Sequence, residues 1–488
     1  MYVMGSQKSI VNSIKWSSLA EIGVKFITPV TTMILARILS PEEFGILAIC
    51  SMIVYFAEII ADSGFGKYIV QADFKDESEL KRYATVAFWS HLAVSLLIWT
   101  IIIVFCSPIV GFLGISGHES VLIVACSQLV FMSMISTQLG LLRRKFEFKS
   151  TFVARIATAV VTFVISISIA LINRSYWSLI IGNVAGSIVN AFILTWLSKW
   201  LPALGYSVSI LRKMFAFSFW SLCEGLAHWF IFWCDVFIAT QFFTIYQLGL
   251  YKNSTAILLS FIGMITASMS PVLLSVLSRL KNDDSYNEVY MRITKLFMYA
   301  LLPICISIYF CRDFVTFVVL GTKWMEAADI IGSWAIMLGI SVFIYSFPAE
   351  IFKSKGIPKY LFFYQLCYIA FLVPICIYAT RYGFWTFVYA RVSCIFIQII
   401  LYVFFTKFVL RWNIKSLFLQ MKSPIGMSVL YGLACIFLFQ HVQSYLFQTL
   451  LCFILFTIYI ALCYCFFRND IQSSVKLLSH KQLNMDLN

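Results

Sequence analysis

Long apolar runs dominate this sequence, and each is separated from the next by a short polar or charged segment. A helix of about 20 residues is long enough to cross the hydrocarbon core of a bilayer, and hydropathy indicates about fourteen such runs. The longest polar connectors, 64–83 and 278–292, are too short for a soluble domain. The chain is therefore predicted to be an all-α polytopic membrane protein. The runs fall near residues 16–39, 44–63, 84–108, 119–141, 151–172, 176–197, 216–240, 249–277, 293–311, 328–350, 360–380, 384–406, 424–442 and 445–467.

Basic residues alternate in density from one connector to the next. If the N-terminus is cytoplasmic, about three quarters of the 36 Lys and Arg residues lie on the inner connectors, as the positive-inside rule requires. We therefore expect both termini to be cytoplasmic. The net charge of +14 is then explained by topology and by contact with anionic lipid, so nucleic acid is not an expected partner.

The stretch 36–45 indicates a tight hairpin between the first two apolar runs. Pro41 suits the first turn of a helix, and so do the acidic residues Glu42 and Glu43. A second and poorer copy of this stretch occupies 239–251, about 204 residues later. It lacks the Ser-Pro-Glu-Glu cluster, so its role is left open.

Trp177 and Trp385 open helices at corresponding places in the two halves of the chain. Runs one to six and seven to twelve are therefore predicted to be parallel repeats, which usually enclose a substrate site. The last two runs have no counterpart. The expected division is an N-lobe over 1–213, a C-lobe over 214–410, and a final helix pair with a cytoplasmic tail over 411–488.

Signatures of an enzyme are missing from the sequence. It has no P-loop, no His/Cys/Asp cluster with metal-binding spacing, and no extramembrane segment large enough for a catalytic pocket. The 14 cysteines lie mostly inside apolar runs and form no C-x-x-C pair, which indicates packing residues. We therefore expect a transporter with no metal and no cofactor.

Six stretches carry a resemblance to a known family: 15–17, 36–45, 62–66, 144–148, 319–324 and 355–356. In this order they resemble the oligosaccharide-lipid flippases (Wzx-like) of bacterial O-antigen, capsule and exopolysaccharide pathways. These belong to the multidrug/oligosaccharidyl-lipid/polysaccharide (MOP) exporter superfamily. The resemblance spans about residues 10–400 and is strongest to the colanic-acid-type branch.

The resemblance implies two MATE-like lobes of six helices in the bacterial inner membrane. It implies translocation of an undecaprenyl-diphosphate-linked oligosaccharide from the cytoplasmic to the outer leaflet, by alternating access. A polysaccharide polymerase and a chain-length regulator are the protein partners that it suggests.

Ionisable side chains inside apolar runs are costly to insert and therefore point to a transport site. Lys25 and Arg391 are expected to contact the diphosphate, and Arg155 is a weaker candidate. Arg155, Glu58 and Asp62 lie near the ends of their runs, where the lipid–water boundary explains them equally well.

Glu21 and Lys25 share one helix face, and so do Glu224, His228 and Asp235. The separation along the chain between Glu21 and Glu224 equals that between Lys25 and His228. This match predicts that the two acid–base pairs face each other across the cavity. One alternative is that the pairs serve only in helix packing. Another is that Glu224 and Asp235 bind a coupling cation. His228 is more ordinarily a hydrogen-bonded interior histidine.

Two other functions fit the same composition. A cation-coupled exporter of the drug-efflux type would use the acidic residues, although the basic residues within the runs suit an anion better. A membrane enzyme of polysaccharide assembly is the third possibility, against which the lack of a large extramembrane segment argues.

Reporter fusions test the predicted topology. Fusions after Lys145 and after Lys355 are expected to report the cytoplasm, and a fusion near Arg174 the outside, because the charge bias places these connectors on opposite sides. An outside signal at Lys355 would contradict the fourteen-span assignment.

Overall fold

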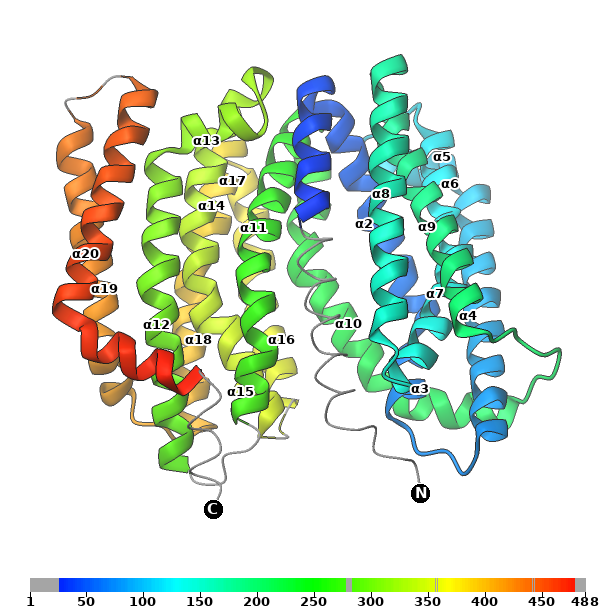
Figure 1. The fold of residues 1–488 in the computed structure, drawn as a ribbon. Coiled ribbons are helices and arrows are strands. Elements are labelled where there is room, and N and C mark those ends of the chain that lie inside the picture. Colours follow the sequence, from blue (N-terminus) through cyan, green and yellow to red (C-terminus); the bar gives the residue numbers. More distant parts are fainter. Residues whose placement is uncertain are drawn as a thin grey trace. The chain divides into compact units, whose positions relative to one another are not determined.

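The computed structural model describes residues 26–277, 283–355, 357, 359–440, 442 and 444–478. Within these residues every regular element is a helix (Figure 1). A helix satisfies its own backbone N–H and C=O groups, which is necessary where the chain crosses a membrane without water. The predicted all-α class is confirmed.

The chain divides into two compact units, Met1–Asn253 and Ser254–Asn488. In the first unit a helical stretch, Phe26–Ile38, precedes the helices that Figure 1 labels. These are α2 (Pro41–Asp62), α3 (Phe65–Gln71), α4 (Glu77–Val104), α5 (Cys106–Phe112), α6 (Glu119–Cys126), α7 (Gln128–Arg144), α8 (Phe148–Asn173), α9 (Trp177–Ser198) and α10 (Val208–Phe242).

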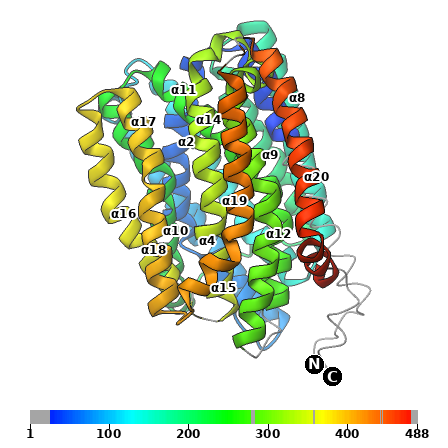
Figure 2. The same cartoon turned by 90° about the vertical axis from the view of Figure 1, so that its left-hand side faces the viewer.

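Helix α11 (Ile245–Leu277) begins in the first unit and continues in the second. In the second unit α19 and α20 lie beside α12, with which both make contacts (Figure 2). The elements of the second unit that follow α11 are α12 (Asp283–Phe310), α13 (Arg312–Val319), the 3₁₀-helix η1 (Thr322–Ala327), α14 (Ala328–Ser341), the π-helix η2 (Val342–Ser346), α15 (Phe347–Ser354), α16 (Lys359–Thr380), α17 (Phe384–Ser393), α18 (Ile395–Phe408), α19 (Ile414–Phe439) and α20 (Tyr445–Leu478).

Among the described residues, 13 helical segments are long and apolar enough to cross a membrane. They correspond one by one to the second and later predicted runs. Some are composite: Glu119–Arg144 combines α6 with α7, and Thr322–Ser354 extends from η1 to α15. The first predicted run, 16–39, is described only over Phe26–Ile38, and the remainder lies outside the described residues.

Both of the long polar connectors contain helix. The segment 64–83 holds α3 and the start of α4, and 278–292 holds the start of α12. Helix α4 begins ahead of its apolar run because Oδ1 of Asp76 accepts a hydrogen bond from the backbone N–H of Glu79 at 2.7 Å. Hydropathy marks the part of a helix that lies in lipid, whereas capping decides where the helix begins.

The boundary between the two units falls within α11, whereas the predicted repeat boundary falls at residues 213 and 214, before α10. Helix α10 packs against α2, α3 and α4. Compactness and sequence repetition are different properties, so the division into 1–213, 214–410 and 411–488 remains a prediction about repeats.

The two hairpin copies start their helices in the same way. At α2 the backbone N–H of Ser40 donates to Oε2 of Glu43 at 2.7 Å. At α11 the N–H of Thr244 donates to Oε1 of Gln247 at 3.1 Å, and the N–H of Gln247 donates to the Thr244 hydroxyl at 3.3 Å. Both starts use the Ser/Thr-x-x-Glu/Gln capping box. The second copy, whose role the sequence left open, therefore begins a helix as the first does.

Two glycines let these helix starts touch through their backbones. A Cβ atom on Gly249 would lie 1.7 Å from the carbonyl oxygen of Pro41, and one on Gly45 would lie 2.2 Å from the carbonyl oxygen of Ile245. The contact is reciprocal, because positions 41 and 45 correspond to 245 and 249 in the second copy. No side chain fits at either glycine unless a helix moves.

Replacing one of these glycines tests the contact. Gly249→Ala is expected to destabilise the purified protein by about 1–3 kcal/mol, because the added methyl group overpacks a backbone contact. The measurement is thermal unfolding in detergent. The matched control is Gly426→Ala in α19, where an added Cβ would meet no atom within 4 Å. Equal melting temperatures for the two variants would contradict the proposed contact.

Candidate functional site

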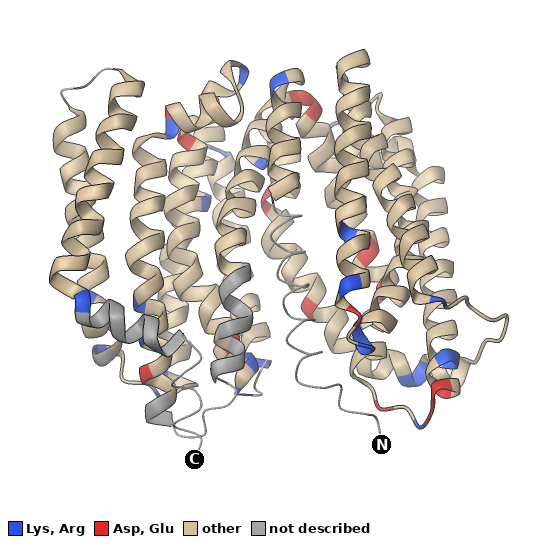
Figure 3. Ribbon diagram, viewed as in Figure 1, with Lys and Arg blue, Asp and Glu red and all other residues tan. Residues whose placement is uncertain are grey.

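Charged side chains are scarce in the middle of the helices. Lys, Arg, Asp and Glu lie mostly toward the helix ends in either unit, and long stretches between them carry none (Figure 3). An ionisable group within a spanning helix is expensive and needs partners, so these few groups mark candidate transport sites.

Asp235 of α10 is one such group, with only 2% of its surface exposed. Its Oδ1 accepts a hydrogen bond from the backbone N–H of Val236 at 2.8 Å. Its Oδ2 accepts one from the hydroxyl of Tyr251, on α11, at 2.7 Å. These bonds offset part of the cost of burying the carboxylate and hold it in one orientation.

Lys252, the next residue on α11, lies at the same crossing of helices. Its Nζ donates to the carbonyl oxygen of Phe232 at 2.9 Å and lies 3.8 Å from the centre of the Trp233 ring. Trp233 in turn stacks on Tyr55 of α2. A cation over an indole face is favourable when water is excluded. The crossing of α10 and α11 therefore holds a buried acid on one helix and an ammonium group on the other.

The other two residues predicted on α10 are exposed. Oε2 of Glu224 lies 3.3 Å from Nζ of Lys67, and both side chains are about half exposed. The ring of His228 lies against Phe232, 4.5 Å between centres. The structure thus gives Glu224 and Asp235 different partners and different burial, although the sequence places both on one helix face.

A further polar cluster, partly buried, joins α2, α4 and α7. Nδ1 of His91 lies 3.7 Å from Oδ1 of Asp62, and the Ser136 hydroxyl donates to the same oxygen. His91 is 1% exposed, and its Nε2 has no hydrogen-bond partner in the described part of the chain. Sequence reasoning missed this cluster because its members come from three helices.

Arg391 of α17 is a buried cation in the second unit, at 4% exposure. Its Nη1 donates to the hydroxyl of Tyr368, on α16, at 2.9 Å. Its guanidinium carbon lies 5.2 Å from the ring centre of Trp334, on α14. Two elements therefore fix the orientation of a planar group that can bind phosphate through two parallel hydrogen bonds.

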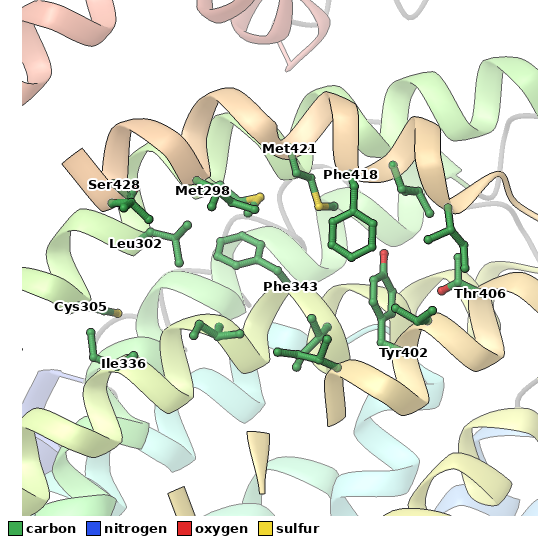
Figure 4. Close-up of a pocket in the computed structure, with 18 of the residues that line it drawn as sticks. Met298, Leu302, Cys305, Ile336, Phe343, Tyr402, Thr406, Phe418, Met421 and Ser428 are labelled. Atoms are coloured by element: carbon green, nitrogen blue, oxygen red, sulfur yellow. The ribbon is translucent and has the colours of Figure 1, made fainter. Parts of the chain in front are cut away.

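The second unit also contains an apolar cavity of about 300 Å³ between α12, α14, η2, α18 and α19 (Figure 4). Arg391 is not among its lining residues. Its composition suits hydrocarbon rather than a sugar. No sequence pattern could have revealed it, because its residues are the same types that fill the packed core. The side chains labelled in Figure 4 are Met298, Leu302, Cys305, Ile336, Phe343, Tyr402, Thr406, Phe418, Met421 and Ser428.

The remaining predicted residues give no joint site. Glu21 and Lys25 lie outside the described residues. Arg155 is half-buried near the start of α8. No three His, Cys, Asp or Glu side chains in the described ranges group as metal ligands, and Cys435 and Cys452 pack in an apolar cluster, as the sequence predicts for cysteine.

Comparison with known proteins identifies the relatives of this chain. The profile of the family described as "Polysaccharide biosynthesis protein" matches residues 34–329, which is more than half of the chain. The succinoglycan biosynthesis transport protein ExoT of Rhizobium meliloti (strain 1021) is 24% identical over 340 residues. That alignment covers 68% of this chain and 67% of ExoT.

Two solved structures share the fold. A lipid II flippase, MurJ, in an inward closed conformation, aligns with a TM-score of 0.74 and 14% identity, over 92% of this chain and 98% of MurJ. An inward-facing multidrug resistance MATE family transporter of the MOP superfamily aligns with a TM-score of 0.59 and 12% identity, over 79% of this chain and 97% of that transporter. The predicted MATE-like class of fold is confirmed.

Proposed function

The chain belongs to the polysaccharide biosynthesis protein family, and on that premise we propose that it is a flippase for lipid-linked oligosaccharide. The substrate is an undecaprenyl-diphosphate-linked repeat unit, which moves from the cytoplasmic to the outer leaflet of the bacterial inner membrane for O-antigen or exopolysaccharide assembly. The observation that supports this most is the family match along residues 34–329, joined to a fold shared with MurJ over nearly the whole chain.

The second unit has chemistry that suits both ends of such a substrate. Its apolar cavity of about 300 Å³ offers a lining for a polyisoprenyl chain. The oriented guanidinium of Arg391 offers hydrogen-bond donors and positive charge for a diphosphate, which lowers the cost of taking that anion out of water. Lys25 and Arg155, singled out from the sequence, remain proposed contacts of the diphosphate.

The membrane potential favours this direction of transport. A diphosphate carries about two negative charges, and an inside-negative potential favours outward movement by about 2.3 kcal/mol per charge per 100 mV. ATP hydrolysis is therefore not required. A polymerase and a chain-length regulator are proposed as the proteins that receive the product.

Cation coupling is a separate proposal. Asp235, buried and hydrogen-bonded to Tyr251, is its best candidate in the described residues. Glu224 supports the proposal less, because it is exposed and pairs with Lys67. The facing of Glu21 with Glu224, and of Lys25 with His228, stays a proposal based on their matching sequence offsets.

Reconstitution tests the function. Purified protein in lipid vesicles is expected to move a lipid-linked oligosaccharide across the bilayer, so that an added glycan-binding protein detects it on the far leaflet. Vesicles without protein are the control. Efflux of a cationic dye without glycan movement would instead identify a drug exporter, and chain elongation would identify an enzyme of assembly.

Substitution of Arg391 tests the diphosphate contact. Arg391→Ala is expected to lower glycan transport by about tenfold or more, because a charge-assisted bond to the anion is lost. Arg391→Lys is expected to restore little, because an ammonium group cannot reproduce the bidentate fork. The control is Arg381→Ala, in the turn before α17. Normal transport by the Lys25→Ala, Arg391→Ala double variant, at equal protein level, would refute the assignment.

A further inference from the structure

A second cavity, of about 440 Å³, lies at one end of the first unit. The start of α4, the loop from Lys199 to Ser207 and the first turn of α10 form its walls. That loop runs beside the start of α4 in Figure 1. None of the residues assigned to the proposed transport function lines this cavity.

The walls of this cavity carry positive charge, and no acidic side chain of the lining balances it. Lys81, Arg82 and Lys199 line the cavity, and its lining includes no Asp or Glu. The side chains of Arg82 and Lys199 form neither a salt bridge nor a hydrogen bond with another described residue. Lys81 lies 3.7 Å from Glu77, but both side chains are more than half exposed, so that pair is weak.

Acidic groups on the first turn of α4 do not cancel this charge. Oε1 of Glu77 is shared between Lys81 and Lys145, each at 3.7 Å. Oε2 of Glu79 accepts a hydrogen bond from the backbone N–H of Lys75 at 2.7 Å. Asp76 caps α4, and a hydrogen bond from the Ser78 hydroxyl lowers the pKa of its carboxyl group, with a smaller contribution from Arg82. The Asp76 carboxylate is therefore already occupied by the helix start.

The loop that closes the cavity is fixed in place. The indole N–H of Trp89 donates to the carbonyl oxygen of Ala203 at 2.8 Å, and the hydroxyls of Ser90 and Tyr206 lie 2.9 Å apart. Trp200 is buried in an apolar cluster with Tyr83 and other residues of α4. The cavity is therefore a formed part of the first unit.

Apolar side chains flank this cationic cavity. Leu201 is 73% exposed and Leu204 is 93% exposed, on a loop that joins two membrane-spanning helices. Such a loop lies at the lipid–water interface, where an exposed leucine contacts hydrocarbon and a lysine or arginine contacts head groups. Cationic and apolar surfaces side by side match a molecule with a phosphate at one end and hydrocarbon at the other.

We propose that this cavity binds the phosphate group of a lipid whose hydrocarbon chain lies along Leu201 and Leu204. A resident anionic phospholipid and a polyprenyl diphosphate share this chemistry. The site goes beyond the proposed transport function, because Lys81, Arg82 and Lys199 take no part in that proposal and binding of a lipid here can be measured without transport.

Lipid binding to the purified full-length protein tests the site. The probes are phosphatidylglycerol, phosphatidylcholine, farnesyl diphosphate and inorganic phosphate, and the readouts are native mass spectrometry and thermal shift in detergent. We expect phosphatidylglycerol or farnesyl diphosphate to bind and stabilise the protein, and phosphatidylcholine to do neither. The stronger binder of the two identifies the source of the phosphate.

A matched pair of variants locates the binding. Arg82→Ala with Lys199→Ala is expected to weaken binding by at least about tenfold, since each basic residue near a lipid head group contributes. Lys75→Ala with Lys149→Ala removes the same charge from exposed positions outside the cavity and is expected to change binding little. Leu204→Ser should weaken binding of long-chain phosphatidylglycerol but not of its short-chain, soluble form.

Three results would overturn the proposal. One is equal binding of phosphatidylglycerol and phosphatidylcholine. Another is saturation by inorganic phosphate alone at the same concentration as the lipids, which would leave no role for the hydrocarbon. The third is an equal loss of binding in the two double variants, which would reduce the effect to net charge. Transport takes no part in these measurements, so a failure of the proposed flippase function would leave them unaffected.

Discussion

Glycine residues let neighbouring helices of this protein pack closely against each other. Lipid tails are as apolar as leucine, so expulsion of water supplies little force between helices inside a bilayer, and close packing has to supply it. Gly45 and Gly249 bring α2 and α11 into backbone contact. Gly182 of α9 instead makes room for a side chain, because a Cβ there would lie 1.8 Å from the Ser166 hydroxyl oxygen of α8. Tyr251 and Lys252, which bond to Asp235 and to the Phe232 carbonyl on α10, follow Gly249 closely along α11.

Most of the fold could be predicted from the sequence, because hydropathy over about 20 residues is a direct consequence of crossing a bilayer. Helix ends were harder to predict. The cap at Asp76 starts α4 well before its apolar run, and hydropathy does not register a cap. The Thr244-to-Gln247 box was visible as a T-x-x-Q pattern, but its residues differ from those of the first copy.

Prediction of the site divided in a similar way. Burial of charge is expensive, so Asp235 and Arg391 could be singled out from sequence alone. Their partners Tyr251 and Tyr368 could not, because a partner depends on how neighbouring helices are rotated and where they cross. The same limit hid the contact between Asp62 and His91. Cavities are harder still, since the residues around an apolar cavity have the same character as those of a filled core.

Because each glycine occupies the space beside the other copy's helix start, neither half of the chain can gain a side chain there alone. The capping position tolerates more than one residue type. The side-chain amide oxygen of Gln247 accepts a backbone N–H bond at the start of α11, as the carboxylate of Glu43 does at the start of α2. The neighbouring residues can therefore be substituted while the spacing between the capping residue and the glycine is kept. The predicted repeat is then better preserved in the backbone roles of positions 40–45 and 244–249 than in residue identity.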